Sequence, residues 1–146
     1  MTEIRAVSQT GSGRDDHSDR AHYAEYLLPP HQPTPKRCYA LGQALRQAVE
    51  SWPSDKRVAV IASGGLSHFV IDEELDHQVI TAMQNSDAAT LTSIPKERLN
   101  SENSEIRNWI ATAGAAEHLK MQLIDYVPCY RSPAGTGCAM SFARWV

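Results

Sequence analysis

His68 is the residue whose position in the sequence most favours a chemical role. It follows an apolar, β-branched run at residues 58–62 and a short stretch that contains two glycines. Glycines after a strand permit a positive φ and let backbone N–H groups approach a ligand, and α/β sheets bind ligands at the carboxyl ends of their strands. His68 is therefore the leading candidate for a chemical role, and the alternative is a hydrogen-bonded structural histidine. Three residues of the stretch are candidates for lining a substrate pocket: Ser63, Gly64 and Gly65.

Glu105 is a second candidate for a functional site. It lies in the first turn of a helix predicted over residues 101–114, which carries apolar residues at helical spacing and ends at Gly114. Trp109 and Thr112 follow on the same side of that helix, so the carboxylate could point into a cleft beside them. The alternative is an acid that occupies a first turn only because the helix dipole favours it.

The elements around these residues predict an α/β fold in which helices flank a mixed β-sheet. Thr34 and Pro35 predict the start of a helix, and Pro53 stops it. The apolar stripe of that helix is expected to pack on the sheet and contains Cys38, Leu41, Leu45, Ala48, Val49 and Trp52. The run at 58–62 predicts a central strand covered on both faces. Asp72 predicts the cap of the next helix.

Two β-rich segments close the chain, at residues 121–130 and 138–145, and the glycine-rich stretch 132–137 between them predicts a turn. Together they indicate a hairpin. Because backbone amides of such a turn could reach a ligand, Thr136 and Gly137 are further candidates for the substrate pocket. A turn with no contact to a ligand is the alternative.

Composition excludes several classes of protein. The chain has 146 residues, of which 42% are hydrophobic and 21% charged, and its net charge is −3 with no cluster of Lys and Arg. This pattern is typical of a globular domain and argues against nucleic-acid binding. No apolar run reaches the length of a membrane span, and the N-terminus lacks the order of a signal peptide, so we expect no membrane association and a cytoplasmic location.

The three cysteines show no metal-binding or disulfide spacing, and we expect reduced, mostly buried thiols.

The N-terminal segment differs from the rest of the chain. Residues 1–25 form a disordered or atypical tail by composition, and residues 26–146 form the domain. His17 and His22 lie in this tail five residues apart, a spacing that does not put two ligands on one helical face. A metal role for them is therefore not expected.

Three motifs, in this order, carry a resemblance to a known family: PTPKRCYALGQAL at 33–45, SGGLSH at 63–68, and S-E-x-x-E-x-x-x-W at 101–109, followed by Ala-Gly-Ala at 113–115. The chain resembles the C-terminal half of the class III extradiol ring-cleaving dioxygenases, the LigB-type catalytic subunits that include protocatechuate 4,5-dioxygenase and gallate dioxygenase. The resemblance covers roughly residues 26–145.

This resemblance implies a function. In that family a non-haem Fe(II) is bound by two histidines and one glutamate, and the enzyme opens the ring of a catecholic aromatic acid with O₂. Glu105 matches the glutamate ligand, and His68 matches an acid/base histidine that is not a ligand. The resemblance therefore implies an Fe(II)-dependent extradiol dioxygenase whose partners are a catechol-type substrate and O₂.

The family's two histidine ligands belong to an N-terminal half that has no counterpart in this sequence, and His17, His22 and His31 stand in a different context. Three interpretations remain open: a fragment of a longer enzyme, a chain that borrows ligands from a partner, or a degenerate, iron-free relative without catalysis. A partial sheet would expose apolar surface, so we also expect a homo-oligomer or a second subunit.

Overall fold

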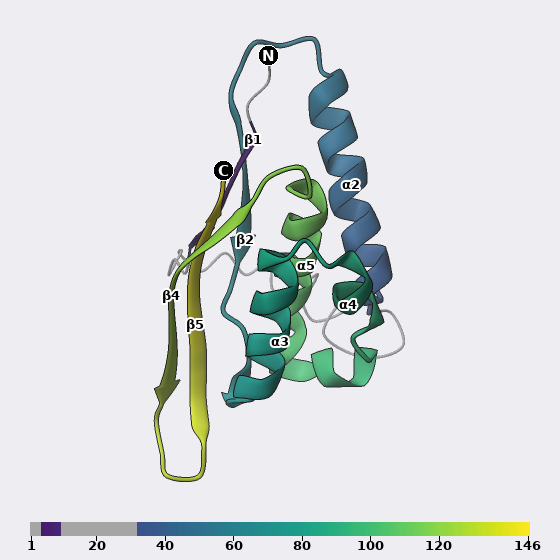
Figure 1. The fold of residues 1–146 in the computed structure, drawn as a ribbon. Helices are drawn as coiled ribbons and strands as arrows, with labels where there is room; N and C mark the ends of the chain where they lie inside the picture. Colours follow the sequence, from purple (N-terminus) through teal and green to yellow (C-terminus); the bar gives the residue numbers. More distant parts are fainter. Residues whose placement is uncertain (1–3, 10–31) are drawn as a thin grey trace, which may run out of the picture.

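A computed structural model describes residues 4–9 and 32–146 of the chain. The described residues form one mixed sheet of five strands with helices packed on it (Figure 1). The strands are β1 (Ile4–Gln9), β2 (Val58–Ser63), β3 (His68–Val70), β4 (Met121–Tyr130) and β5 (Thr136–Trp145). The helices are α2 (Pro35–Ser51), α3 (Glu73–Gln84), α4 (Ala88–Ser93) and α5 (Ile106–Ala115), with short 3-10 turns η1 (Lys96–Leu99) and η2 (Ser101–Glu105). The predicted fold class is confirmed.

Strand β5 connects the sheet. It pairs antiparallel with β4 along its length, with β3 near its start and with β1 near its end. The predicted hairpin is therefore present, with β5 beginning at Thr136, two residues earlier than expected. Strands β1 and β2 are parallel, and α2 connects them in the sequence.

Strand β2 corrects one expectation. The strand order β2-β1-β5-β3 places β2 at an edge of the sheet formed by the described residues, so the prediction of a central strand is wrong. Its burial alternates, with Ala62 buried and Ile61 53% exposed. The helices lie on one side of the strands (Figure 1), and a β-branched run covered on one face alternates in this way.

The N-terminal segment contains a strand that its composition did not lead us to expect. Within residues 1–25, Ile4–Gln9 form β1 and pair with the whole of β2. The rest of the predicted tail, together with His17, His22 and His31, lies outside the described residues. The domain boundary at residue 26 stays a prediction.

The core lies between the sheet and the helices. Most of its largest fully buried side chains come from α3, α4, α5 and the segments that join these helices, and Leu66 comes from the segment between β2 and β3. They include Leu66, Leu75, Val79, Leu91, Leu99, Ile106, Trp109 and Ile110. Helix α5 is well specified, as predicted, although the part expected to begin it is the 3-10 turn η2. No helix among the described residues has the length and apolar character needed to cross a membrane.

Helix α2 starts at the predicted cap, where Thr34 Oγ1 accepts from the Arg37 N–H, but its buried face differs from the predicted stripe. Cys38 and Val49 are buried, whereas Leu41, Leu45 and Trp52 are 65%, 44% and 50% exposed. The reason is that α2 packs closely on α5 through glycines, and this contact turns a different face inward.

Gly42 and Gly114 set the distance between these two helices. A Cβ at Gly42 would lie 2.7 Å from the Ala115 nitrogen and closer still to the Ala111 carbonyl oxygen, and one at Gly114 would collide with the backbone of Tyr39. Backbone atoms cannot move aside as a flexible side chain can, so the two helices approach this closely only where the Cβ is absent.

We expect Gly42→Ala to lower the free energy of unfolding by about 1–3 kcal/mol or more, because α2 must move away from α5. Urea unfolding followed by circular dichroism measures this. Gln47→Ala, an exposed position on the same helix, is the matched control and should change stability by less than about 0.5 kcal/mol. Equal stability of wild type and Gly42→Ala would contradict this packing.

Candidate active site

The segment from Ser63 to His68 forms a bend between β2 and β3, and it brings His68 and Glu105 together. Gly64 has φ +99°, a conformation that side chains other than glycine rarely adopt. A Cβ there would also collide with the carboxylate of Glu105. The next residue, Gly65, donates its backbone N–H to Glu105 Oε2 at 3.1 Å. Because Gly64 has no side chain, the Glu105 carboxylate can lie directly against the backbone of the bend.

Glu105 stands at the end of η2, where its side chain is 44% exposed. Its Oε2 lies 3.3 Å from His68 Nε2. The contact is an ion pair only when the imidazole is protonated. The structure thus brings the two residues singled out by the sequence into direct contact, although 36 residues separate them along the chain.

Hydrogen bonds define which nitrogen of His68 faces the site. Nδ1 lies 2.7 Å from the carbonyl oxygen of Leu66. A carbonyl only accepts, so Nδ1 carries a hydrogen, and in the neutral ring Nε2 has the free lone pair. The backbone N–H of His68 donates to Asn103 Oδ1 at 2.9 Å and so fixes the start of β3. This arrangement presents Nε2 as a proton acceptor beside Glu105.

The helix that follows Glu105 holds the bend from the other side. Trp109 is fully buried, and its indole Nε1 donates to the carbonyl oxygens of Gly64 and Gly65 at 3.2 and 3.1 Å. Asn108 Nδ2 donates to the Ser63 carbonyl at 2.8 Å. Glu105 and Trp109 are four residues apart, a spacing that puts both on one side of a helix. This explains physically why the motif carries a glutamate and a tryptophan at these positions.

Asp76 holds the bend from α3, and sequence reasoning missed it. The residue is fully buried, and its carboxylate accepts from the Ser67 N–H at 2.8 Å, from Ser67 Oγ at 2.7 Å and from the Tyr126 hydroxyl at 2.8 Å. Burial raises the pKa of the Asp76 carboxyl, although these donors act in the opposite direction. In the sequence Asp76 resembles Glu73 and Glu74, acids of a first helical turn. The only signal in the sequence is that its spacing from Leu75 and Val79 places it on the buried side of α3.

Arg107 is also buried, and the acceptors of its guanidinium among the described residues are not acidic. Its guanidinium donates to the backbone carbonyls of Pro33 and Leu99. Burial lowers its pKa. The residue fastens the segment before α2 to the start of α5, and its role is structural.

The other candidates for the substrate pocket divide into two groups. Gly64 and Gly65 contact Glu105, and Ser63 is tied to Asn108 through its carbonyl. Thr136 and Gly137 lie on β5, opposite Val70 and Phe69 of β3. They are next to the position paired with His68, but the Thr136 hydroxyl is hydrogen-bonded within its own turn to Ser132.

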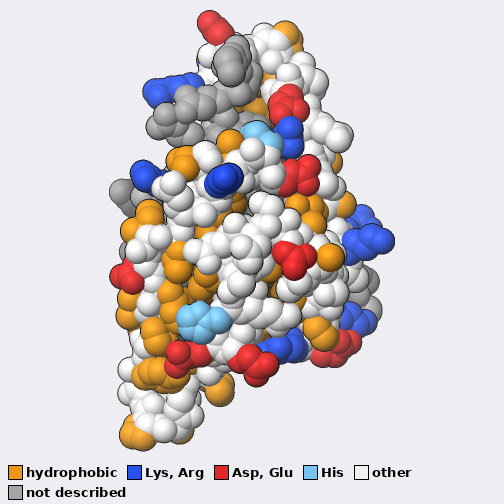
Figure 2. All heavy atoms as spheres, in the orientation of Figure 1, with side chains coloured by type: hydrophobic (Ala, Val, Ile, Leu, Met, Phe, Trp, Pro, Cys, Tyr) orange, Lys and Arg blue, Asp and Glu red, His pale blue; other side chains and the backbone are white. Residues whose placement is uncertain are grey.

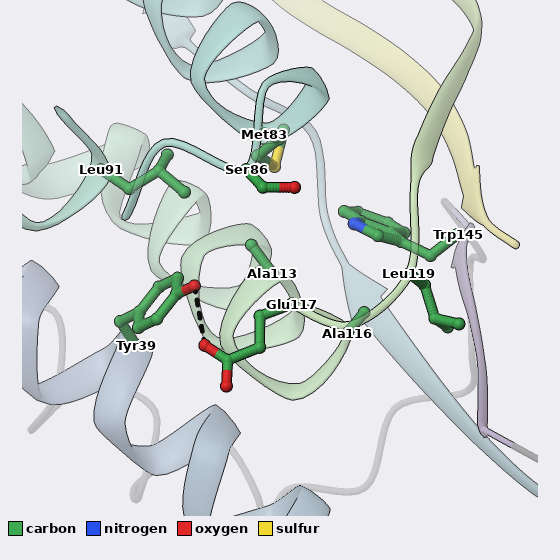
Figure 3. Close-up of a pocket in the computed structure, with 9 residues that line it drawn as sticks. All are labelled: Tyr39, Met83, Ser86, Leu91, Ala113, Ala116, Glu117, Leu119 and Trp145. Carbon is green, nitrogen blue, oxygen red and sulfur yellow. Dashed lines mark hydrogen bonds between the residues drawn. The ribbon is translucent and has the colours of Figure 1, made fainter. Parts of the chain in front are cut away.

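A separate hollow in the surface is lined by neither His68 nor Glu105. Figure 3 shows it between α2, α3, α5 and the end of β5, lined largely by apolar side chains. Its polar contact joins the Tyr39 hydroxyl to Glu117 Oε2 at 3.1 Å. Burial, followed by this hydrogen bond, raises the pKa of Tyr39 to about 12. The contact helps to fasten α2 to the end of α5.

The described residues do not complete a metal site. Within residues 32–146, no group of three His, Cys, Asp or Glu side chains is arranged to hold a metal ion. Glu105 offers one carboxylate, whereas a two-histidine, one-carboxylate centre needs three donors on one side of the metal. Further donors would have to come from outside this part of the chain.

Comparison with known proteins identifies the family. The family model of the catalytic LigB subunit of aromatic ring-opening dioxygenases matches residues 28–138, which is most of the chain. The chain therefore belongs to the LigB family of ring-opening dioxygenases.

The chain is also similar to a curated enzyme. The chain is 36% identical over 124 residues to the gallate dioxygenase of Pseudomonas putida (strain KT2440), an alignment that covers 73% of this chain and 34% of the relative. The chain thus spans about one third of that enzyme's length.

Removing the Asp76 carboxylate should destabilise the protein. Asp76→Ala leaves the Ser67 and Tyr126 donors buried without their acceptor, so we expect a loss of about 3–5 kcal/mol in the free energy of unfolding. Tyr126→Phe removes a single hydrogen bond and should cost about 1 kcal/mol. Urea unfolding of both variants checks this order, and equal losses would contradict the central place of Asp76.

The raised pKa of Asp76 also predicts a pH dependence. A carboxyl that keeps its proton more readily in the folded state stabilises the protein at low pH, and this contribution is lost as pH rises above the unfolded value of 3.8 through the folded pKa. Wild type should therefore lose stability relative to Asp76→Asn over that rise. Unfolding measured across pH for both proteins tests it, and a constant difference would contradict the shift.

Proposed function

We propose that this chain supplies the acid/base histidine and one carboxylate ligand of an Fe(II)-dependent extradiol dioxygenase that opens the ring of a catecholic aromatic acid. The observation that carries the proposal is the 3.3 Å contact between His68 Nε2 and Glu105 Oε2 on the glycine bend of a LigB-family chain. A gallate- or protocatechuate-like acid is the proposed substrate, together with O₂, and the resemblance to gallate dioxygenase supports this class. We also propose a cytoplasmic location.

The proposed role of His68 follows from its hydrogen bonds. With Nδ1 held by the Leu66 carbonyl, the free Nε2 can take a proton from a phenolic hydroxyl placed beside Glu105. The anionic Glu105 would then serve as an oxygen donor for the metal, while the bend lines one side of the substrate. Because the described donors hold no metal by themselves, the remaining ligands would come from a further part of the enzyme or from a partner chain.

The alternative is a non-catalytic subunit or an iron-free remnant of the family. It is favoured by the absence of a three-donor cluster within residues 32–146. Anaerobic addition of Fe(II), followed by a catechol and then O₂, distinguishes the two functions. When the part of the enzyme or the partner chain that supplies the remaining ligands is present, the dioxygenase should take up iron and yield the yellow ring-opened product. Failure to take up iron under that condition would support the remnant.

Replacing His68 tests the acid/base role. In the protein that forms product, His68→Ala should lower the rate about 10²- to 10⁴-fold, because proton transfer is lost. His77→Ala is the matched control, since His77 is an exposed histidine on α3, and it should keep the wild-type rate. Product formation is followed by absorbance, and an unchanged rate in His68→Ala would reject the role.

Replacing Glu105 tests the ligand role. Glu105→Ala should lower the iron content after anaerobic loading, because a carboxylate oxygen donor is lost. Glu74→Ala removes an exposed glutamate from α3 and should retain the wild-type content. Metal analysis of the desalted proteins measures the difference. Stoichiometric iron in Glu105→Ala would exclude Glu105 as a ligand.

We further propose that the chain associates with itself or with a second subunit. Figure 2 shows hydrophobic side chains gathered along the strand side of the molecule, while charged side chains lie mainly over the helices. The exposed large hydrophobic residues of the strands are Ile61, Phe69, Val70, Ile124, Val127 and Tyr130. Burying such surface favours association. Light scattering after size-exclusion chromatography should report a mass above the monomer, and a monomer would count against homo-oligomers.

A further inference from the structure

Two cysteines that are separate in the sequence lie opposite each other in the sheet. Cys129 of β4 and Cys138 of β5 are register partners, and Cys138 is also the partner of His68 in β3. Partners in an antiparallel pair point to the same face. Cys129, Cys138 and His68 therefore form a row across three strands, which the spacing of the cysteines in the sequence does not indicate.

The backbone register places the Cα atoms of the two cysteines at a separation that a disulfide can span. Ala139 directs both its N–H and its carbonyl toward the segment before β3, where they bond to Ser67 and Leu66. Because these groups alternate along an antiparallel strand, those of Cys138 point toward Cys129 on β4. Such a pair has a Cα separation of about 5.5 Å, which lies within the range of about 4.4–6.8 Å that a disulfide spans.

The two thiols differ in accessibility, which suggests an order of reaction. Cys129 is exposed and Cys138 is half-buried, whereas Cys38 is buried in the core. The Cys138 thiol donates a hydrogen bond to Met140 Sδ at 3.5 Å. Burial raises the pKa of Cys138, and the charges of Glu105 and Cys129 raise it further. Because Cys129 is the more exposed of the two thiols, it meets an oxidant first.

We propose that Cys129 and Cys138 are a peroxide-sensitive pair that closes to an intrachain disulfide across β4 and β5. The Cys129 thiolate attacks one oxygen of hydrogen peroxide and the O–O bond breaks. The leaving hydroxide takes the proton that the thiol gave up, so a sulfenic acid and water are formed. The Cys138 sulfur then attacks the sulfenic sulfur and displaces a second water. Two thiols lose two electrons and two protons, and peroxide takes them up. This inference does not depend on the proposed function.

The disulfide would lie next to the candidate active site. Cys138 is the β5 residue that pairs with His68 at the start of β3. The new bond would therefore join β4 to the β5 residue that pairs with His68. Reduction by a dithiol restores the original state. The pair is thus a modification site beside the contact between His68 and Glu105.

Peptide mapping of the folded chain after hydrogen peroxide treatment tests the pair. Trypsin cuts after Arg131, which separates Cys129 in the peptide 121–131 from Cys138 in the peptide 132–144, and Cys38 falls in a third peptide, 38–46. We expect an intact mass lower by two hydrogen atoms, the first two peptides joined, and Cys38 still open to alkylation. A dithiol should reverse the change.

Cysteine variants and the alternative oxidation products distinguish this disulfide from other outcomes. Cys38→Ser should still form the disulfide, whereas Cys129→Ser and Cys138→Ser should not. Dimers linked through Cys129, overoxidised cysteines without joined peptides, oxidation confined to Met140, or three free thiols after treatment would each overturn the proposal. Because wild type alone gives each of these readings, the test does not depend on the variants folding.

Discussion

The candidate site depends on a short backbone segment that side chains from other elements hold in place. Glu105 and Trp109 take up the N–H and carbonyl groups of the glycine pair, Asn103 holds the start of β3, and the buried Asp76 holds Ser67 from α3. Ala139 of β5 pairs with the Leu66 N–H and the Ser67 carbonyl, and the side chains named above satisfy further backbone groups of the bend. Its conformation, and with it the direction of the His68 ring, follows from this network.

The same hydrogen bonds connect the site to parts of the chain that are distant from His68. The close contact of α2 and α5 through glycines sets the position of α5, and α5 carries the tryptophan that holds the bend. On the other side, Tyr126 of β4 connects the hairpin to Asp76 and so to Ser67. The position of the bend therefore depends on packing far from His68. The link is made by short, buried hydrogen bonds, which are costly to leave unsatisfied.

Much of the fold was predictable because capping residues and apolar spacing act locally. The start of α2 at Pro35, the Asp72 cap of α3, the helix around Trp109 and the closing hairpin all follow from such signals. The edge position of β2, the inward face of α2 and the burial of Asp76 depend on which elements meet in space, and periodicity does not show this. The approach of Glu105 to His68 was expected from the family resemblance, and its geometry needed the structure.

The central claim is that His68 presents Nε2 to Glu105 while the Leu66 carbonyl holds Nδ1. Long-range ¹H–¹⁵N NMR of the imidazole, assigned with a His68→Asn variant, measures this directly. The neutral ring should carry its proton on Nδ1, and Glu105→Gln should shift the Nε2 resonance while Glu74→Gln leaves it unchanged. A proton on Nε2, or a ring that does not respond to Glu105→Gln, would contradict the account.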